Sequence, residues 1–406
     1  MPEPKVRFKM DDGSSFPAWN DVVLGDIATR VTRKNTNGET DRPLTIASIE
    51  GLVDQRTYFG KTIASKDMSG YFLLKKGEYA YNKSYSAGYD YGSIKRLDKY
   101  DMGALSTLYI CFALDEDQNT DFYDCYFNGL SWYNQMPQIC AEGARNHGLL
   151  NVSPNDFFKI QLSVPSSKEE QQKIADFLSS VDEVIAASEE EVANLETQKK
   201  AAMKRIFSQE VRFKRDDGTE FPEWEDGCFE DLIEIYDERV TADCTLPVLT
   251  SSKQYGIQFQ SDHFAKEQQH DITGYSVLPR GYCTYRNRSD GTDFTFNINN
   301  LCDKGIVSKF YPVFKATDKC VLYFLMTLLN NEPTTVKKIS ITAKGTGQKV
   351  LSFLDLQKIS IPIPCLEEQR LIADFLSDFD EAIAAAKKEL GLWKELKKGL
   401  LQQMFA

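Results

Sequence analysis

The sequence contains two copies of one pattern, and this internal repeat constrains the fold more than any other feature. The N-terminal segment Val6-Arg7-Phe8-Lys9, Asp11-Asp12-Gly13, Phe16-Pro17 and Trp19 returns as Val211-Arg212-Phe213-Lys214, Asp216-Asp217-Gly218, Phe221-Pro222 and Trp224. A later segment, Ile174-Ala175-Asp176-Phe177-Leu178-Ser179, returns as Ile372-Ala373-Asp374-Phe375-Leu376-Ser377. The chain is therefore expected to form two tandem copies of a globular unit followed by a long helix, and a duplicated chain of this kind can fold about an internal two-fold axis.

Two segments carry apolar residues at alternating steps of four and three, which is the heptad pattern of coiled-coil helices. The first seam consists of Ile174, Leu178, Val181, Ile185, Ser188, Val192, Leu195, Lys199, Ala202 and Ile206. The second consists of Ile372, Leu376, Phe379, Ile383, Ala386, Leu390, Trp393, Lys397, Leu400 and Met404. Because both seams are interrupted at matching positions, by a small residue and by a lysine, the two helices are expected to pack on each other.

The regions outside the helices are rich in aromatic and turn residues. Short apolar runs such as Leu108–Phe112 and Val321–Leu325 alternate with glycine and Asn/Asp turns, which favours mixed domains with a strong strand content. The predicted fold class is α+β. It has two tandem, pseudo-two-fold-related mixed α/β domains at 1–165 and 211–364, separated by two long antiparallel coiled-coil helices at 166–210 and 365–406.

Composition excludes several classes of protein. With 406 residues, of which 42% are hydrophobic, each repeat can bury its own core. No apolar run approaches the roughly 20 residues of a membrane span, and the N-terminus is charged, so a soluble, cytoplasmic protein is expected. Nine cysteines without a C-x-x-C pair and three scattered histidines argue against disulfides and against a metal site.

The net charge of −12 is unusual for a protein that binds nucleic acid. Residues 1–165 carry 18 basic and 21 acidic side chains, and residues 211–364 carry the same numbers, so the globular regions are nearly balanced. Any attraction to phosphate must therefore come from local patches.

Two matching segments combine polar, basic and aromatic side chains, and they are the candidates for contacts with DNA bases. The first contributes Tyr81, Asn82, Lys83, Ser84 and Tyr89, and the second contributes Tyr285, Arg286, Asn287, Arg288 and Ser289. Arginine and lysine pair with guanine and asparagine pairs with adenine, each good pair giving about 1–3 kcal/mol of discrimination. Ordinary surface loops have a similar composition, which is the alternative interpretation.

A glycine turn precedes each helical region and supplies candidate phosphate contacts. These are Arg145 and Asn146 in the first repeat and Lys344, Gln348 and Lys349 in the second. Exposed backbone amides beside a basic residue suit a phosphate group, although a simple loop entering the next strand is the alternative. Trp19 and Trp224, by contrast, are interpreted as core residues that anchor the first strand of each domain.

At this point the chain resembles the specificity (S) subunit of type I restriction-modification enzymes over essentially its whole length. The resemblance rests on the twofold succession of a variable domain and a long helix. It also rests on the junctions Ile361-Pro362-Ile363-Pro364 with Glu367-Glu368-Gln369, and Val164-Pro165 with Glu169-Glu170-Gln171. The first junction departs from the pattern, with Gln161-Leu162-Ser163 where a proline is often found.

The resemblance implies two target recognition domains that each read one part of a split, asymmetric double-stranded DNA target. It implies that the helices form a spacer that docks two methyltransferase (M) subunits, through which restriction (R) subunits join. It implies no catalytic residue, metal or cofactor in this chain, because S-adenosylmethionine, ATP and Mg belong to the partners. The alternatives are a self-contained DNA enzyme, for which no phosphate loop or Asn-Pro-Pro-aromatic motif is found, and a duplicated scaffold or adhesive protein.

Overall fold

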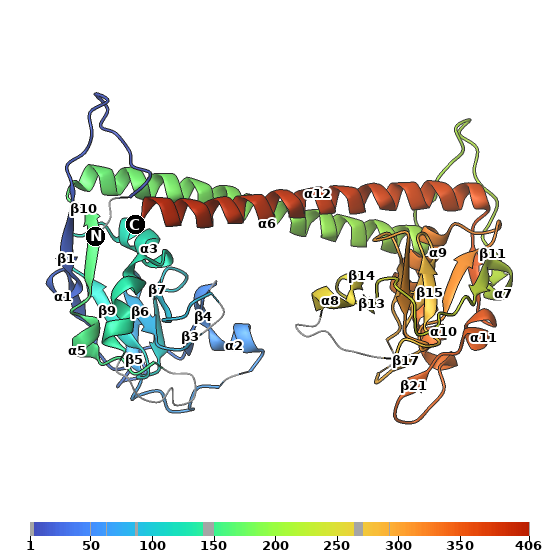
Figure 1. The fold of residues 1–406 in the computed structure, drawn as a ribbon, viewed down its shortest axis with the longest axis horizontal. Coiled ribbons are helices and arrows are strands. Elements are labelled where there is room, and N and C mark those ends of the chain that lie inside the picture. The colour runs from blue at the N-terminus through green and yellow to red at the C-terminus, as the bar shows by residue number, and fades with distance from the viewer. Residues whose placement is uncertain are drawn as a thin grey trace. The chain divides into compact units, whose positions relative to one another are not determined.

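In the computed structural model of the chain, the described residues are 4–48, 50–61, 63–85, 88–140, 150–263, 271–291 and 293–405. The chain forms two compact units (Figure 1). Unit 1 consists of Met1–Glu189 together with Lys388–Ala406, and unit 2 consists of Glu190–Lys387. Two long helices, α6 (Lys168–Phe207) and α12 (Leu366–Met404), each contribute residues to both units.

A four-stranded antiparallel sheet, in the order β2-β9-β6-β7, lies at the centre of unit 1. Its strands are β2 (Ala28–Arg30), β6 (Tyr79–Asn82), β7 (Ser93–Arg96) and β9 (Ile110–Leu114). Three strand pairs surround it: β1 (Trp19–Val23) with β10 (Gln161–Pro165), β3 (Leu44–Ala47) with β4 (Gly51–Asp54), and β5 (Phe72–Lys75) with β8 (Met102–Leu105). Its short helices are α1 (Leu24–Ile27), α2 (Gln55–Phe59), α3 (Thr120–Asn128), the 3-10 helix η1 (Ser131–Gln135), α4 (Met136–Ile139) and α5 (Pro154–Phe157).

Unit 2 repeats this architecture with a sheet in the order β12-β20-β16-β18. Its strands are β12 (Ile233–Tyr236), β16 (Cys283–Tyr285), β18 (Phe296–Ile298) and β20 (Val313–Ala316). The accompanying pairs are β11 (Glu225–Cys228) with β22 (Ser360–Ile363), β13 (Leu249–Ser252) with β14 (Gly256–Phe259), β15 (Ser276–Pro279) with β19 (Lys304–Val307), and β17 (Arg288–Ser289) with β21 (Lys349–Val350). Its short helices are α7 (Phe229–Leu232), α8 (Gln260–His263), α9 (Leu322–Asn331), α10 (Pro333–Thr342) and α11 (Phe353–Gln357).

The heptad positions form the less exposed faces of α6 and α12, since all twenty seam residues predicted from the sequence are buried or half-buried. Within unit 1, Lys397 binds Asp182, and Lys394 Nζ lies 2.7 Å from Glu189. Within unit 2, Lys199 Nζ lies 2.5 Å from Asp380, and Lys387 bonds to Glu196 at 2.6 Å. In each unit, the residue nearer the C-terminus of α6 pairs with the residue nearer the N-terminus of α12. The helix segments therefore run antiparallel.

Each unit takes core residues from both long helices. In unit 1, Ile174 and Leu178 at the start of α6 and Met404 and Phe405 at the end of the chain belong to one buried cluster with the central sheet. In unit 2, Ile372 and Leu376 at the start of α12 join Ile206 near the end of α6. The sequence predicts four segments with boundaries at the ends of the helices. The two compact units instead divide each long helix, because each core takes residues from the start of one helix and the end of the other.

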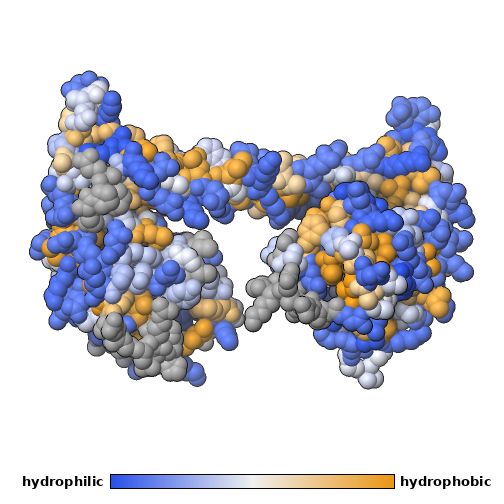
Figure 2. Space-filling view, in the orientation of Figure 1, coloured by the Kyte–Doolittle hydropathy of each residue, from blue (hydrophilic) through white to orange (hydrophobic). Residues whose placement is uncertain are grey.

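The repeated N-terminal motif is explained by an ion pair with the start of each long helix. Arg7 bonds to the buried carboxylate of Glu170 through Nε at 2.9 Å and Nη2 at 2.8 Å, and it also donates to the carbonyl of Pro17. Trp19 Nε1 donates to the same carboxylate at 3.3 Å, in agreement with the anchoring role predicted for this residue. The hairpin between Lys9 and Ser15 projects beyond α6 with a hydrophilic tip (Figures 1 and 2).

The sequence pattern could not distinguish a strand from a helix for the two short apolar runs. Residues 110–114 form strand β9, whereas the other apolar run, at 321–325, enters helix α9. A short apolar run buried on all sides carries no periodicity that separates a strand from a helix. Across the described residues, none of the helices has an apolar stretch long enough to cross a membrane.

Candidate nucleic-acid interface

In unit 2, the structure brings together the two segments proposed to contact bases and phosphates. Strands β17 and β21 pair antiparallel, with Arg288 opposite Val350 and Ser289 opposite Lys349. The Leu351 amide donates to the Asn287 carbonyl at 2.9 Å, which continues the pairing beyond the strands. The two loops, which are remote in sequence, therefore form one surface.

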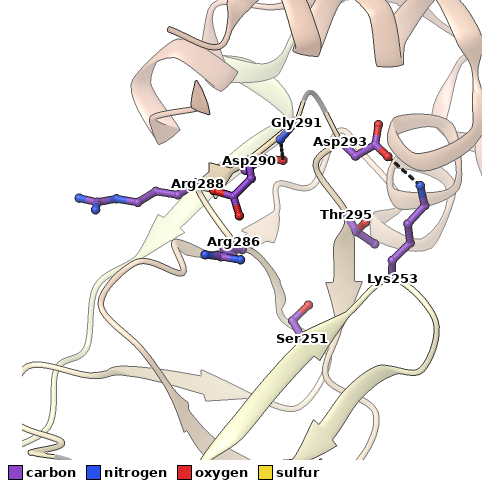
Figure 3. Close-up of a pocket in the computed structure, with 9 residues that line it drawn as sticks. Ser251, Lys253, Arg286, Arg288, Asp290, Gly291, Asp293 and Thr295 are labelled. Carbon is purple, nitrogen blue, oxygen red and sulfur yellow. Dashed lines mark hydrogen bonds and ion pairs between the residues drawn. The ribbon is translucent and has the colours of Figure 1, made fainter. Parts of the chain in front are cut away.

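A polar pocket of about 570 Å³ opens on this surface (Figure 3). Its lining residues come from β13 and the turn after it, from the segment between β16 and β17, from β17 and from the loop that follows β17: Ser251, Lys253, Arg286, Arg288, Ser289, Asp290, Gly291, Asp293 and Thr295. Three of these side chains are basic and two are acidic, so the pocket presents both hydrogen-bond donors and acceptors. The geometry suits a ligand that itself carries both donors and acceptors.

The two arginines of the pocket flank a residue whose backbone is fixed on both sides. Asn287 donates its amide to the Phe310 carbonyl at 2.9 Å and accepts from Leu351. Arg286 and Arg288 both line the pocket, from the two sides of a bend at Asn287. The Arg288 guanidinium lies 4.1 Å from the centre of the Phe310 ring, a cation–π contact. Arg286 is exposed and makes no hydrogen bond or ion pair within the described residues.

Two residues of the pocket wall, Lys253 and Asp293, were not predicted from the sequence. Lys253 follows β13 and forms an ion pair with Asp293 at 3.0 Å. The β13–β14 hairpin is held against the central sheet by Asn297, whose Nδ2 donates to Ser251 Oγ at 2.7 Å and to the Ser252 carbonyl at 3.0 Å. In the sequence, this element is marked by a lysine and a tyrosine, Tyr255, in a turn that is followed by a glycine. The structure shows that Tyr255 is exposed.

The prediction that Tyr81 and Tyr285 contact bases is wrong, because both side chains are fully buried. Tyr81 stacks on Phe157 with ring centres 4.6 Å apart and donates its hydroxyl to the Tyr91 carbonyl at 2.7 Å. Tyr285 donates to the Leu351 carbonyl at 3.0 Å. Burial raises the pKa of both phenols, so they remain neutral donors. These tyrosines belong to the scaffold that the two repeats share.

The remaining predicted residues of unit 1 lie around the end of β6. Asn82 Oδ1 accepts from the Ser84 amide at 3.0 Å, which makes Asn82 a turn residue. Lys83 and Ser84 are half-buried, and burial lowers the pKa of Lys83. Tyr89 is half-buried, with the Lys95 ammonium 5.6 Å from its ring centre, and burial raises its pKa. The Leu150 amide donates to the Lys83 carbonyl, as Leu351 donates to Asn287 in unit 2.

The predicted phosphate contacts differ in their surroundings. Lys344 is exposed and bonds to Asp355 at 2.8 Å, and this contact is the main reason why the pKa of Asp355 is lowered. Gln348 Nε2 donates to Asp290 Oδ1 at 3.0 Å. Lys349 is half-buried in β21. Arg145 and Asn146 lie outside the described residues.

Comparison with known proteins places both repeats in one family. The family model for the type I restriction modification DNA specificity domain matches residues 19–197 and 223–391. Among curated proteins, the type I restriction enzyme MjaVIII specificity subunit of Methanocaldococcus jannaschii is 33% identical over 107 residues, which are 26% of this chain and 24% of that protein. The putative MjaX specificity subunit of the same organism is 26% identical over 286 residues, covering 64% of this chain and 61% of the relative. The chain thus spans less than two thirds of either relative.

Solved structures share the fold at low sequence identity. The S subunit of a type I restriction-modification system from M. genitalium superposes with a TM-score of 0.55 at 12% identity, over 100% of this chain and 99% of that one. A chain from a structure that describes complex assembly and conformational transition of the type I R-M system superposes with a TM-score of 0.53 at 18% identity, covering 96% and 98% of the two chains. These likenesses establish the fold.

Proposed function

Since the chain belongs to the type I restriction modification DNA specificity family, we propose that it is the DNA-reading subunit of a type I restriction-modification complex and performs no catalysis itself. Each unit would dock one recognition domain on duplex DNA and read one part of a split, asymmetric target in the major groove. The loops that line such a surface read the sequence directly where their side chains reach base edges.

The observation that carries this proposal is a shared scaffold with different side chains at matching positions. Tyr81 and Tyr285 occupy matching buried positions at the ends of β6 and β16. The next residue is Asn82 in unit 1 and the exposed Arg286 in unit 2. The two domains share one framework but carry different side chains beside the matching buried tyrosines. They are therefore suited to two different half-sites.

We further propose that the outer faces of α6 and α12 dock two methyltransferase subunits, and that restriction subunits join through them. The exposed residues Asp176 and Phe177 of α6 recur as Asp374 and Phe375 of α12, so the outer faces would offer equivalent surfaces to two identical partners. S-adenosylmethionine, ATP and Mg would then be bound by the partners. Native mass spectrometry of the complex purified from its host tests this part, with two methyltransferase copies per chain as the expected result.

The DNA-binding proposal is tested by measuring the affinity of the full-length chain for a pool of random duplexes at several salt concentrations. For a DNA-binding protein, log K falls linearly with log salt, with a slope of about −0.9 per phosphate contact. Sequencing of the retained duplexes should return a split motif with two unrelated halves. A chain that retains no duplex at low salt, or retains every sequence equally, would favour the scaffold or adhesive alternative.

A further inference from the structure

We infer that the pocket of unit 2 reads one G·C base pair, with Arg286 contacting the guanine and Asp290 contacting the cytosine. This inference rests on the proposed DNA-reading function and assigns a base pair to one half of the target. Asp290 was not among the residues predicted from the sequence to contact DNA.

The donor side of the pocket fits guanine. In the major groove, guanine presents two acceptors, N7 and O6, and an arginine fork can bind both at once. Arg286 is the arginine of the pocket whose guanidinium has neither a stacking partner nor an ion pair within the described residues, and its neighbour Asn287 is fixed at both backbone groups. The planar guanidinium forms two hydrogen bonds to such an acceptor pair at once, so less conformational entropy is lost for each bond than with a lysine.

The acceptor side of the pocket fits cytosine. Cytosine presents the N4 amino group in the major groove, and aspartate is a suitable acceptor for it. Gln348 holds Asp290 through Oδ1 at 3.0 Å, while Oδ2 makes no hydrogen bond among the described residues. The carboxylate is therefore oriented and keeps one oxygen open. Gln348, predicted as a phosphate contact, instead positions this acid.

The mixed charge of the pocket argues against a phosphate as its occupant. Asp290 and Asp293 both line it, and a carboxylate repels a phosphate oxygen while it attracts an amino group. Arg288 serves a different role, because its guanidinium lies 4.1 Å from the centre of the Phe310 ring, and its side chain extends to one side in Figure 3. Asp293 is already paired with Lys253 at 3.0 Å, which leaves Asp290 as the more available acceptor.

Unit 1 lacks this arrangement. Asn82 stands where unit 2 has Arg286, and its Oδ1 accepts from the Ser84 amide at 3.0 Å. An asparagine reads adenine through both its oxygen and its amino group, so Asn82 in this turn is not free to make that pair. The G·C contact is therefore expected in one half of the target only.

The test is selection of duplexes from a random pool by the full-length chain and by three variants. Arg286→Ala should lower the preference for guanine at one position by about 5- to 150-fold, the range that corresponds to a bidentate base contact. Asp290→Ala should lower the preference at the same base pair. The matched control is Asp303→Ala, which removes an exposed carboxylate of unit 2 that pairs with Arg280 at 3.0 Å outside the pocket and should leave the selected sequence unchanged. Thermal unfolding of each variant checks that the fold is retained.

The outcomes separate this inference from the proposed function. If the wild-type chain selects no sequence, the DNA-reading proposal fails and this inference fails with it. If the wild type selects a split motif but Arg286→Ala and Asp290→Ala leave both halves unchanged, only the inference is overturned. It is also overturned if Arg286→Ala weakens binding to all sequences equally, or if Asp303→Ala has the same effect as Asp290→Ala.

Discussion

Lys199 donates a hydrogen bond to Asp380 at 2.5 Å, and Lys397 binds Asp182 in the same way in the other repeat. Each lysine occupies a seam position where a heptad pattern calls for an apolar residue. The lysine side chains are only 16% and 24% exposed. The interruptions of the two seams are therefore satisfied by an acid on the opposing helix, and this pairing fixes the helix register in each unit.

Reversing the charge of Lys199 should weaken this register. Lys199→Asp places two carboxylates together and is expected to lower the free energy of unfolding by about 1 kcal/mol. The double variant Lys199→Asp with Asp380→Lys should recover most of the loss, as measured by urea unfolding. Lys200→Asp on the exposed face of α6 is the control. A double variant no more stable than the single one would refute the pairing argument.

Removing Arg7 should destabilise unit 1 strongly. The Glu170 side chain has 0% exposure, so Arg7→Ala leaves a buried carboxylate without its ion pair, which costs roughly 3–5 kcal/mol. Arg33→Ala is the matched control, because the Arg33–Glu78 pair is more exposed, at 38% and 13%, and should cost roughly 1 kcal/mol or less. Calorimetry of both variants gives the comparison, and equal losses would count against the buried clamp.

Lys95 should make the stability of unit 1 depend on pH. Burial lowers the pKa of Lys95 to about 8, with Asp124 and Asp182 opposing the shift and Lys397 adding to it. Between pH 8 and 10 the unfolded chain binds more protons at this lysine than the folded chain does, so its contribution to stability rises with pH. The gain in melting temperature caused by Lys95→Met should therefore be largest near pH 7.5 and shrink towards pH 10. A constant difference across this window would contradict the argument.

Lys344 is expected to contact a DNA phosphate. Lys344→Ala should weaken binding to all duplex sequences similarly and reduce the slope of log K against log salt by about 1. Lys358→Ala is a matched control, because Lys358 is equally exposed and also lies near Asp355, at 3.8 Å. Fluorescence anisotropy over a range of salt concentrations measures both slopes. A sequence-selective effect of Lys344→Ala would exclude the phosphate role.

We expect the length of the helix pair to set the spacing of the two half-sites. Removing one heptad from each helix, residues 186–192 and 388–394, shortens each by about 10 Å, which is roughly 3 base pairs of B-DNA. Methylome sequencing of a host that carries this variant should show both half-sites unchanged and the spacer shortened. An unchanged spacer would refute the role of the helices as a ruler.

The sequence alone determined the duplication, the two long helices and their seams. Repetition and heptad periodicity can be recognised from the order of residues alone, without knowledge of tertiary contacts. The seam from Ile174 to Ile206 is the less exposed face of α6, as predicted. The same local reasoning identified the segment that contains Arg286, because basic side chains beside glycine and serine turns stand out in composition.

Only the tertiary structure decided which of those side chains can meet a ligand. Tyr81 and Tyr285 belong to segments with the composition of a binding loop, yet both are buried because they lie within β6 and β16, which pack in the core. Lys253 and Asp293 reach the pocket through pairing between segments that are remote in sequence. Gln348 similarly contacts Asp290 across 58 residues of chain. Such contacts depend on how strands and hairpins pack, and no periodicity within a single segment records them.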